Sequence, residues 1–351
     1  MKKNNSFFLL LTFALLVFSA CRNESKRPIP DVSHIKAAVK IERFERDLFK
    51  IDSTKMSSEI ANLYSKYSDF ADLYFANIME MRPPKDEPQT KFVPAVFQKS
   101  VSGFINHRGV RSMYDTTQIV FKELAQAEKT LSQTMQFYNY YFPKKQLPKF
   151  YSFVSEYHYA SVSGGDSIIG LGLDMFLGEK YAAYSMQGLE IPHYISRTLT
   201  PENLPVFATS ALIDELAAKG QSTRMLDVMI QNGKKLYVLE QLMPYTADSL
   251  RFGYTAKQMD WCRNNERDMW AFFLDQKLIY NTNQKEFRRF TEPSPTTMGM
   301  PLESPGRTAN YTGYQIVAQY MELFPAISLE ELLKTTDAEK ILKASKYKPK
   351  K

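Results

Sequence analysis

Glu266 and Arg307 are the two side chains of this sequence best placed to do chemistry. Glu266 lies in a predicted helix over residues 256–280, four residues after Cys262, within an apolar stripe that also holds Met269. A carboxylate buried without a partner costs too much free energy, so it must be paired or solvated. Two interpretations follow: an acid–base or ligand-binding carboxylate, or a structural ion pair. We expect the ion pair, with Arg307 as the partner.

Arg307 belongs to the segment SPGRTANYTGYQIVAQYM, residues 304–321. Pro305 and the glycine after it predict a turn, and the apolar residues that follow recur at helical spacing. The glycines straddle a helix start and do not form a phosphate-binding loop. We expect a core-packing corner, in which Gly313 allows close approach to the glycine-bearing strand near residue 170.

Other catalytic and metal-binding patterns are missing from the sequence. No H-E-x-x-H, Cys/His cluster, G-x-S-x-G or P-loop occurs, and GLGLDMFLG predicts a buried strand ending at Gly178 instead of a dinucleotide fingerprint. Cys262 is expected to be a buried apolar side chain, and His158 a hydrogen-bonded strand histidine. We therefore expect no catalytic residue, no metal ligand and no cofactor. The histidines are scattered: His34, His107, His158 and His193.

Composition places the chain among globular proteins. It has 351 residues, 44% of them hydrophobic, and a formal net charge of +7. A dispersed charge of this size does not predict nucleic-acid binding. The chain has only two cysteines, Cys21 and Cys262, and once Cys21 is acylated no internal disulfide can support the core.

The N-terminus, MKKNNSFFLLLTFALLVFSAC, has a basic start, a short apolar run and small residues before Cys21. Such a run is too short to span a membrane and predicts a signal peptide over residues 1–20. Cys21 directly after the small residues is similar to the bacterial lipoprotein signal, although Phe18 stands where Leu is usual. We expect Cys21 to be lipidated and residues 21–40 to form a tether.

Periodicity beyond the tether predicts one globular domain over residues 41–345, closed by a basic tail over residues 346–351. The fold class we expect is α+β and predominantly helical, with a small antiparallel sheet, a β-hairpin at Gly164-Gly165-Asp166, packed by helices. Asp115 and Pro143 are expected to bound one early helix. Later helices are expected over residues 201–219, 223–243, 256–280 and 309–324, and capping boxes pair Thr255 with Gln258, Ser328 with Glu331, and Thr336 with Glu339.

Long segments in a fixed order resemble the gliding-motility lipoprotein GldB family of Bacteroidota. They include IPHYISRTLTPENL, MLDVMIQNGKKLYVLEQLMP, GYTAKQMDWCRNNERDMWAFF and SPGRTANYTGYQIVAQYM. The resemblance implies a lipoprotein anchored in the outer membrane through acylated Cys21, facing the periplasm, and required by a gliding machinery linked to type IX secretion. Its partners would be other gliding or secretion envelope proteins, and no catalytic residues come with the family.

A second similarity is to zinc peptidases, in which a β-hairpin is followed by a ligand-bearing helix. Here that helix, PENLPVFATSALIDELAAKG, holds no histidine, and Asn232 stands before Gly233 where those families have a glutamate. The similarity implies a zincin-like core without its metal site. We expect a non-enzymatic component or assembly factor of the gliding and secretion machinery. The alternatives are a lipid-anchored zinc-dependent hydrolase with a non-standard metal site, and a periplasmic solute-binding protein.

Overall fold

The sheet has four strands in the order β1-β2-β4-β3 in the computed structural model, which describes residues 28–81, 93–218, 220 and 223–349. Strands β1 and β4 both run parallel to β2, and only β3 and β4 form an antiparallel hairpin. The predicted hairpin is confirmed, but the sheet is mixed and not antiparallel. A parallel pair needs a long crossover, which local patterning does not reveal. The strands are β1 Ile41–Arg43, β2 Lys149–Phe153, β3 Ser161–Gly164 and β4 Ile168–Gly172.

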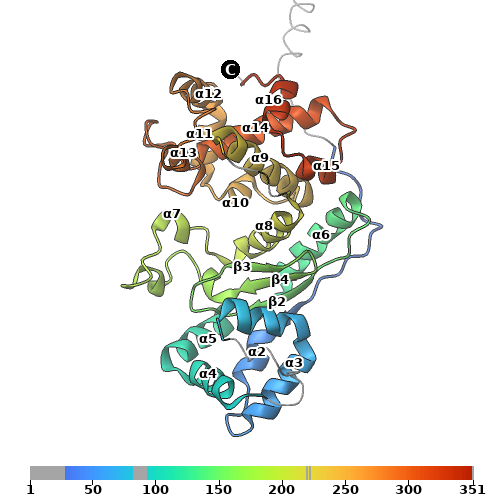
Figure 1. The fold of residues 1–351 in the computed structure, drawn as a ribbon, viewed down its shortest axis with the longest axis vertical. Helices are drawn as coiled ribbons and strands as arrows, with labels where there is room; N and C mark the ends of the chain where they lie inside the picture. The colour runs from blue at the N-terminus through green and yellow to red at the C-terminus, as the bar shows by residue number, and fades with distance from the viewer. Residues whose placement is uncertain (1–27, 82–92, 219, 221–222, 350–351) are drawn as a thin grey trace, which may run out of the picture. The chain divides into compact units, whose positions relative to one another are not determined.

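Helices cover both faces of this sheet (Figure 1). On one face, helices from residues 44–120 pack against Tyr151 and Phe153 of β2. On the other, α6 and α8 pack with Phe150, Ile169 and Leu171. The first group is α2 Phe44–Phe49, α3 Met56–Asp72, the π-helix η2 Leu73–Ile78, α4 Ala95–Asn106 and α5 Arg108–Val120, and the second group is α6 Ala125–Tyr141 and α8 Leu204–Leu216.

An apolar stripe at helical spacing runs along α3 and into η2, and all its members are buried: Met56, Ile60, Leu63, Tyr67, Phe70 and Tyr74. The expected start of α6 is wrong. Asp115 lies inside α5, and a break at residues 121–124 separates α5 from α6, which ends at Tyr141 just before Pro143.

The remaining helices follow the sheet in the chain. The expected helix over residues 256–280 is two helices, broken at Asn265. Short helices connect the sheet to this half: η3 Leu173–Phe176, η4 Ala182–Ser185, α7 His193–Ser196 and η5 Pro201–Asn203. The others are α9 Met225–Leu242, α10 Asp248–Phe252, α11 Ala256–Asn264, α12 Glu266–Asp275, α13 Gln284–Thr291, α14 Thr308–Leu323, α15 Leu329–Lys334 and α16 Ala338–Ser345.

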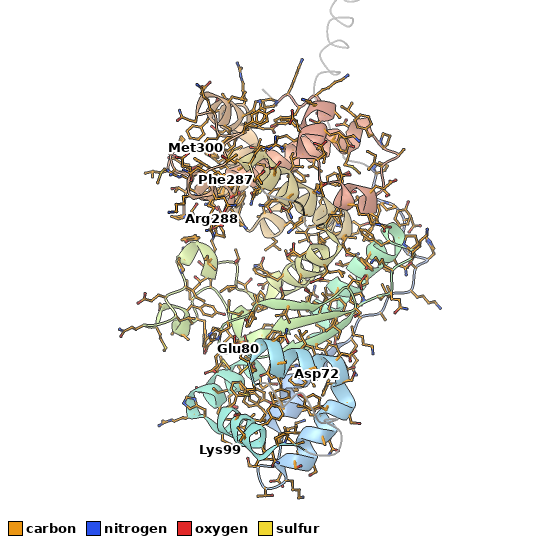
Figure 2. All side chains as sticks on the ribbon, viewed as in Figure 1. Asp72, Glu80, Lys99, Phe287, Arg288 and Met300 are labelled. Atoms are coloured by element: carbon orange, nitrogen blue, oxygen red, sulfur yellow. The ribbon has the colours of Figure 1, made fainter. Side chains whose placement is uncertain are left out.

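Local signals fix several of these helix starts. The capping boxes at Thr255 and Ser328 are confirmed, whereas α16 is capped by Asp337 and not by Thr336. Helix α13 is amphipathic: Phe287 is buried, and the neighbouring Arg288 lies at the surface (Figure 2). The fold is therefore α+β and predominantly helical, as predicted, but a zincin-like core is not confirmed.

The ends of the folded part differ from the expected boundaries. Residues 32–351 form one compact unit. Val32 and Ala37 are buried, and Val39 N donates to Ser132 Oγ of α6 at 2.9 Å. Residues 32–40 of the expected tether thus pack along the fold. The predicted signal peptide and Cys21 lie outside the described residues, and among those that are described no helix is long and apolar enough to cross a membrane.

Helices α9 and α14 cross backbone to backbone at two glycines. A Cβ built on Gly313 would lie 2.0 Å from the carbonyl oxygen of Met229, and one built on Gly233 would lie 2.3 Å from the carbonyl carbon of Gly313. Any side chain at either position would force the helices apart. The prediction of close packing at Gly313 is confirmed, but its partner is α9 and not the strand.

The two glycines of β4, Gly170 and Gly172, allow a different close contact. A Cβ on Gly170 would lie 2.7 Å from Val162 and 3.0 Å from the Phe70 ring, and one on Gly172 would lie 1.9 Å from the carbonyl oxygen of Tyr159. These two glycines therefore allow close packing on one face of β4, with Phe70, Val162 and Tyr159 as the neighbours.

Replacing Gly313 by Ala should destabilise the fold by about 1–3 kcal/mol, because the added methyl group overpacks the α9–α14 contact. The matched control is Gly103→Ala in α4, where an added Cβ has no heavy atom within 4 Å. That control should be neutral or stabilising by up to about 1 kcal/mol, because Ala favours a helix over Gly. Denaturant unfolding of both variants measures the difference, and equal effects would contradict the crossing.

Candidate functional site

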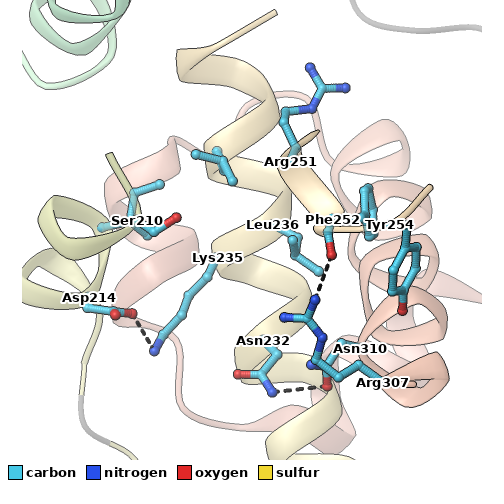
Figure 3. Close-up of a pocket in the computed structure, with 12 residues that line it drawn as sticks. Ser210, Asp214, Asn232, Lys235, Leu236, Arg251, Phe252, Tyr254, Arg307 and Asn310 are labelled. Atoms are coloured by element: carbon cyan, nitrogen blue, oxygen red, sulfur yellow. Dashed lines mark hydrogen bonds and ion pairs between the residues drawn. The ribbon is translucent and has the colours of Figure 1, made fainter. Parts of the chain in front are cut away.

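A pocket lies where α8, α9, the α10 turn and the start of α14 meet (Figure 3). Its cavity volume is about 190 Å³, and it is partly open to solvent. Charged and amide side chains share its wall with apolar ones. The lining residues are Ser210, Ile213, Asp214, Asn232, Lys235, Leu236, Leu239, Arg251, Phe252, Tyr254, Arg307 and Asn310.

The glycine crossing positions two of the amides. Asn232 precedes Gly233 on α9, and Asn310 lies one turn before Gly313 on α14, so the close helix approach brings their side chains together. Asn232 Nδ2 donates to Asn310 Oδ1 at 3.0 Å, and Asn310 Nδ2 donates to the carbonyl oxygen of Thr291 at 2.9 Å. The floor of the pocket is therefore fixed by hydrogen bonds across the crossing.

Arg307 occupies an unusual backbone position at the N-cap of α14. Its φ of 59° lies in the left-handed region, which is uncommon for a residue other than glycine and costs about 1–3 kcal/mol. The guanidinium lies over the Tyr254 ring, 5.8 Å from its centroid, and Nη2 donates to the carbonyl oxygen of Phe252 at 2.8 Å. The Tyr254 hydroxyl in turn donates to the carbonyl oxygen of Gly306 at 2.8 Å, which holds the turn before Arg307 in place.

A second guanidinium, that of Arg197, donates to the same turn. Its Nη2 donates to the carbonyl oxygen of Gly253 at 3.0 Å, and its Nη1 donates to Gln258 Oε1 at 2.6 Å. Burial, and then the positive charge of Arg307, lower the pKa of Arg197 from its ordinary value. Within the described ranges neither Arg197 nor Arg307 has a carboxylate at ion-pair distance.

The other two cations of the pocket are compensated. Lys235 Nζ pairs with Asp214 Oδ1 at 2.6 Å across the cavity mouth between α9 and α8 (Figure 3). Arg251 lines the wall with its stem, whereas its guanidinium turns away to pair with Asp248 and with Glu240. The positive charge left without an acidic partner is thus concentrated at Arg307 and Arg197.

The predicted pair between Glu266 and Arg307 is wrong. Glu266 is 4% exposed and accepts a hydrogen bond from the Tyr347 hydroxyl at 2.9 Å, while Arg307 bonds to the Phe252 carbonyl. Glu266 is buried and has a partner, as expected. That partner, Tyr347, lies in the segment that was expected to be the basic tail. Spacing along the chain shows that a charge needs compensation and does not show which distant residue supplies it.

The histidines and Cys262 stay outside the pocket. His158 Nδ1 bonds to the carbonyl oxygen of Ser155 at 2.7 Å, so the expected hydrogen bond is present, but in a turn and not in a strand. Cys262 is fully buried, as expected, and burial raises the pKa of its thiol. Over the part of the chain that the structure describes, no three His, Cys, Asp or Glu side chains come together in a way that could hold a metal ion.

Sequence reasoning missed Arg197, Lys235 and Asn310 as parts of one site. A signal was present on α9, where Asn232, Lys235, Leu236 and Leu239 recur at helical spacing and so share a face. That pattern shows a mixed polar and apolar face. It does not show that Arg197, or the start of α14, lies opposite.

Asp174 was also missed, and it is a buried carboxylate just after β4. Its Oδ2 accepts hydrogen bonds from the backbone N–H groups of Ser155 at 3.0 Å and Tyr157 at 2.6 Å, while Oδ1 has no partner among the described residues. Burial raises the pKa of the Asp174 carboxyl to about 6, although the two N–H groups act in the opposite direction. This carboxylate positions the loop between β2 and β3 and does not line the pocket.

Comparison with known proteins identifies a family for this chain. A family model described as gliding motility protein GldB matches residues 25–349, which include the sheet, the α9–α14 crossing and the pocket. No curated protein and no solved structure matched the chain.

The raised pKa of Asp174 predicts the direction in which the free energy of unfolding changes with pH. The folded state holds the proton more tightly than the unfolded state, so wild-type stability should fall as pH rises from about 4 to about 6. The Asp174→Asn variant keeps an oxygen acceptor for both N–H groups and does not titrate. The unfolding free energy of wild type minus variant should therefore decrease by about 2–3 kcal/mol between pH 4 and pH 7.

The control for this measurement is Asp166→Asn. A hydrogen bond from Lys145 lowers the pKa of the exposed Asp166 carboxyl, so its contribution has the opposite sign and is lost as pH falls below about 4. Denaturant unfolding across the pH range measures both variants. Parallel curves for wild type and Asp174→Asn would show that the buried carboxyl does not titrate as described.

Proposed function

The chain belongs to the family of the gliding motility protein GldB, and from that membership we propose a non-enzymatic role in the gliding machinery. The family is one of lipoproteins with a part in gliding motility. In this proposal the chain is a component or an assembly factor of the gliding and type IX secretion apparatus. Acylated Cys21 anchors it in the outer membrane, and the folded part faces the periplasm and contacts other envelope proteins.

The observation that carries the proposal is the family match over residues 25–349. The matched range covers all the elements that line the pocket. The side chains of the pocket also favour binding over chemistry. Arginine stays protonated in proteins and cannot act as a general base, and the pocket's lysine is paired with Asp214.

The alternative is a lipid-anchored zinc-dependent hydrolase. One observation bears on it: α8 and α9, the two helices named in the peptidase similarity, meet at one pocket together with the start of α14. At that pocket they present Ser210, Asp214, Asn232 and Asn310, which is not a set of donors suited to catalytic zinc. The donor chemistry therefore supports the non-enzymatic role.

Metal analysis separates the two functions. Folded protein purified without a histidine tag should contain far less than one zinc per chain, because the pocket offers one carboxylate and two amides instead of three strong ligands. Elemental analysis after dialysis measures this ratio. Stoichiometric zinc that is lost on Asp214→Ala would overturn the proposal in favour of the hydrolase.

Crosslinking in intact cells tests the proposed partners. After crosslinking and purification under denaturing conditions, mass spectrometry should identify other gliding or secretion proteins of the envelope. The control is Cys21→Ser, which cannot be acylated and should leave the membrane fraction and lose those partners. A chain that stays membrane-bound after this substitution, or that captures no envelope protein, contradicts the proposal.

A further inference from the structure

Two guanidiniums that have no acidic partner among the described residues donate to the same turn, and one of them, Arg307, lines the pocket. Arg307 and Arg197 donate to the consecutive carbonyl oxygens of Phe252 and Gly253, and a Cβ built on Gly253 would lie 2.9 Å from Arg307 Nη2. Both side chains are half-buried. Like charges brought together out of water without compensation are unfavourable, and a bound anion relieves both the repulsion and the desolvation.

The two arginines differ in how many donors they have left. Arg197 uses three, since its Nε also donates to the carbonyl oxygen of Tyr194 at 3.2 Å. Arg307 uses one, the bond to the Phe252 carbonyl, and its other N–H groups have no acceptor among the described residues. Arg307 therefore offers an open fork, the geometry that binds a carboxylate through two parallel hydrogen bonds. Arg197 adds a second positive charge on the same turn.

The other lining residues of the pocket indicate which kind of molecule the bound carboxylate belongs to. Apolar surface comes from Ile213, Leu236 and Leu239, while Asn232 and Ser210 supply groups that can hydrogen-bond an amide. A cavity of about 190 Å³ is smaller than the roughly 300–1,000 Å³ typical of pockets for drug-sized ligands. It suits the end of a chain with one apolar side chain and does not suit a peptide passing through.

We propose that this pocket binds the C-terminal carboxylate of a polypeptide, with Arg307 as the direct ligand and the apolar wall receiving the last side chain. This inference deepens the proposed role in protein contacts and rests on it. The left-handed backbone of Arg307 agrees with the assignment, because the turn fixed by Tyr254 and Gly306 holds the guanidinium at the pocket in a conformation that arginine rarely adopts.

The test titrates the purified full chain with a fluorescein-labelled Ala-Ala-Leu peptide, as the free acid and as the C-terminal amide, and follows anisotropy. The free acid should bind at least about tenfold more tightly than the amide, because only the acid pairs with the guanidinium fork. Arg307→Gln should abolish that preference. Arg288→Gln, which removes an exposed arginine on α13 paired with Glu292, should leave it unchanged (Figure 2).

A second variant tests the same site in case Arg307→Gln does not fold. If Arg307→Gln lowers the melting temperature strongly, Ser210→Phe blocks the cavity while leaving both guanidiniums, and it should weaken binding of the free acid at least about tenfold. Retained tight binding in a folded Ser210→Phe protein would overturn the location.

Competition decides the identity of the anion. Free leucine, inorganic phosphate and an amidated peptide with an internal Asp should each compete more weakly than Ala-Ala-Leu acid. Equal or better competition by leucine, phosphate or the Asp peptide would overturn the assignment in favour of a free amino acid, a phosphate or an acidic side chain, respectively. No preference for acid over amide in the native chain would overturn it altogether. None of these failures removes a crosslinked envelope partner, so the proposed function is judged separately.

Discussion

The contact between α9 and α14 is the constraint on which the rest of the structure depends. At Gly233 and Gly313 the two backbones touch, with no room for a single methyl group between them. Because helices at this distance cannot slide or rotate freely, the residues beside each glycine have fixed neighbours. The Asn232–Asn310 bond and the position of Arg307 at the start of α14 both follow from that contact.

Three consecutive residues of α9 connect it to three different parts of the fold. Gly233 faces α14, while Lys234 donates to the carbonyl oxygens of Leu333 and Thr335 at the end of α15, where a positive charge is favourable. Burial lowers the pKa of Lys234 to about 8, so the carbonyls offset only part of its desolvation. Lys235 then reaches Asp214 on α8 and forms one side of the pocket. One turn of helix therefore couples the C-terminal helices to the helix that lies on the sheet.

The charged groups at the pocket and the buried carboxylate of Asp174 have different roles in the structure. At the pocket, the charges without acidic partners belong to arginines, which keep their protons and can attract and orient an anion but cannot accept a proton. Burial raises the pKa of the Asp174 carboxyl to about 6, and its Oδ2 accepts hydrogen bonds from two backbone N–H groups of the β2–β3 loop. Asp174 therefore holds the β2–β3 loop outside the pocket, whereas the arginine beside the cavity is suited to binding an anion.

The sequence by itself determined the features set by neighbouring residues: the buried stripe of α3, the hairpin at Gly164-Gly165, the capping boxes at Thr255 and Ser328, and the family. Only the tertiary structure decided which distant groups meet. It paired β1 with β2 in parallel, gave Glu266 the Tyr347 hydroxyl instead of Arg307, and placed Gly313 against α9 instead of β4. The physical reason is that periodicity and capping act over a few residues and leave their pattern in the local sequence. A buried charge or a missing Cβ shows that a close partner is needed, and the partner is chosen by how the whole chain packs.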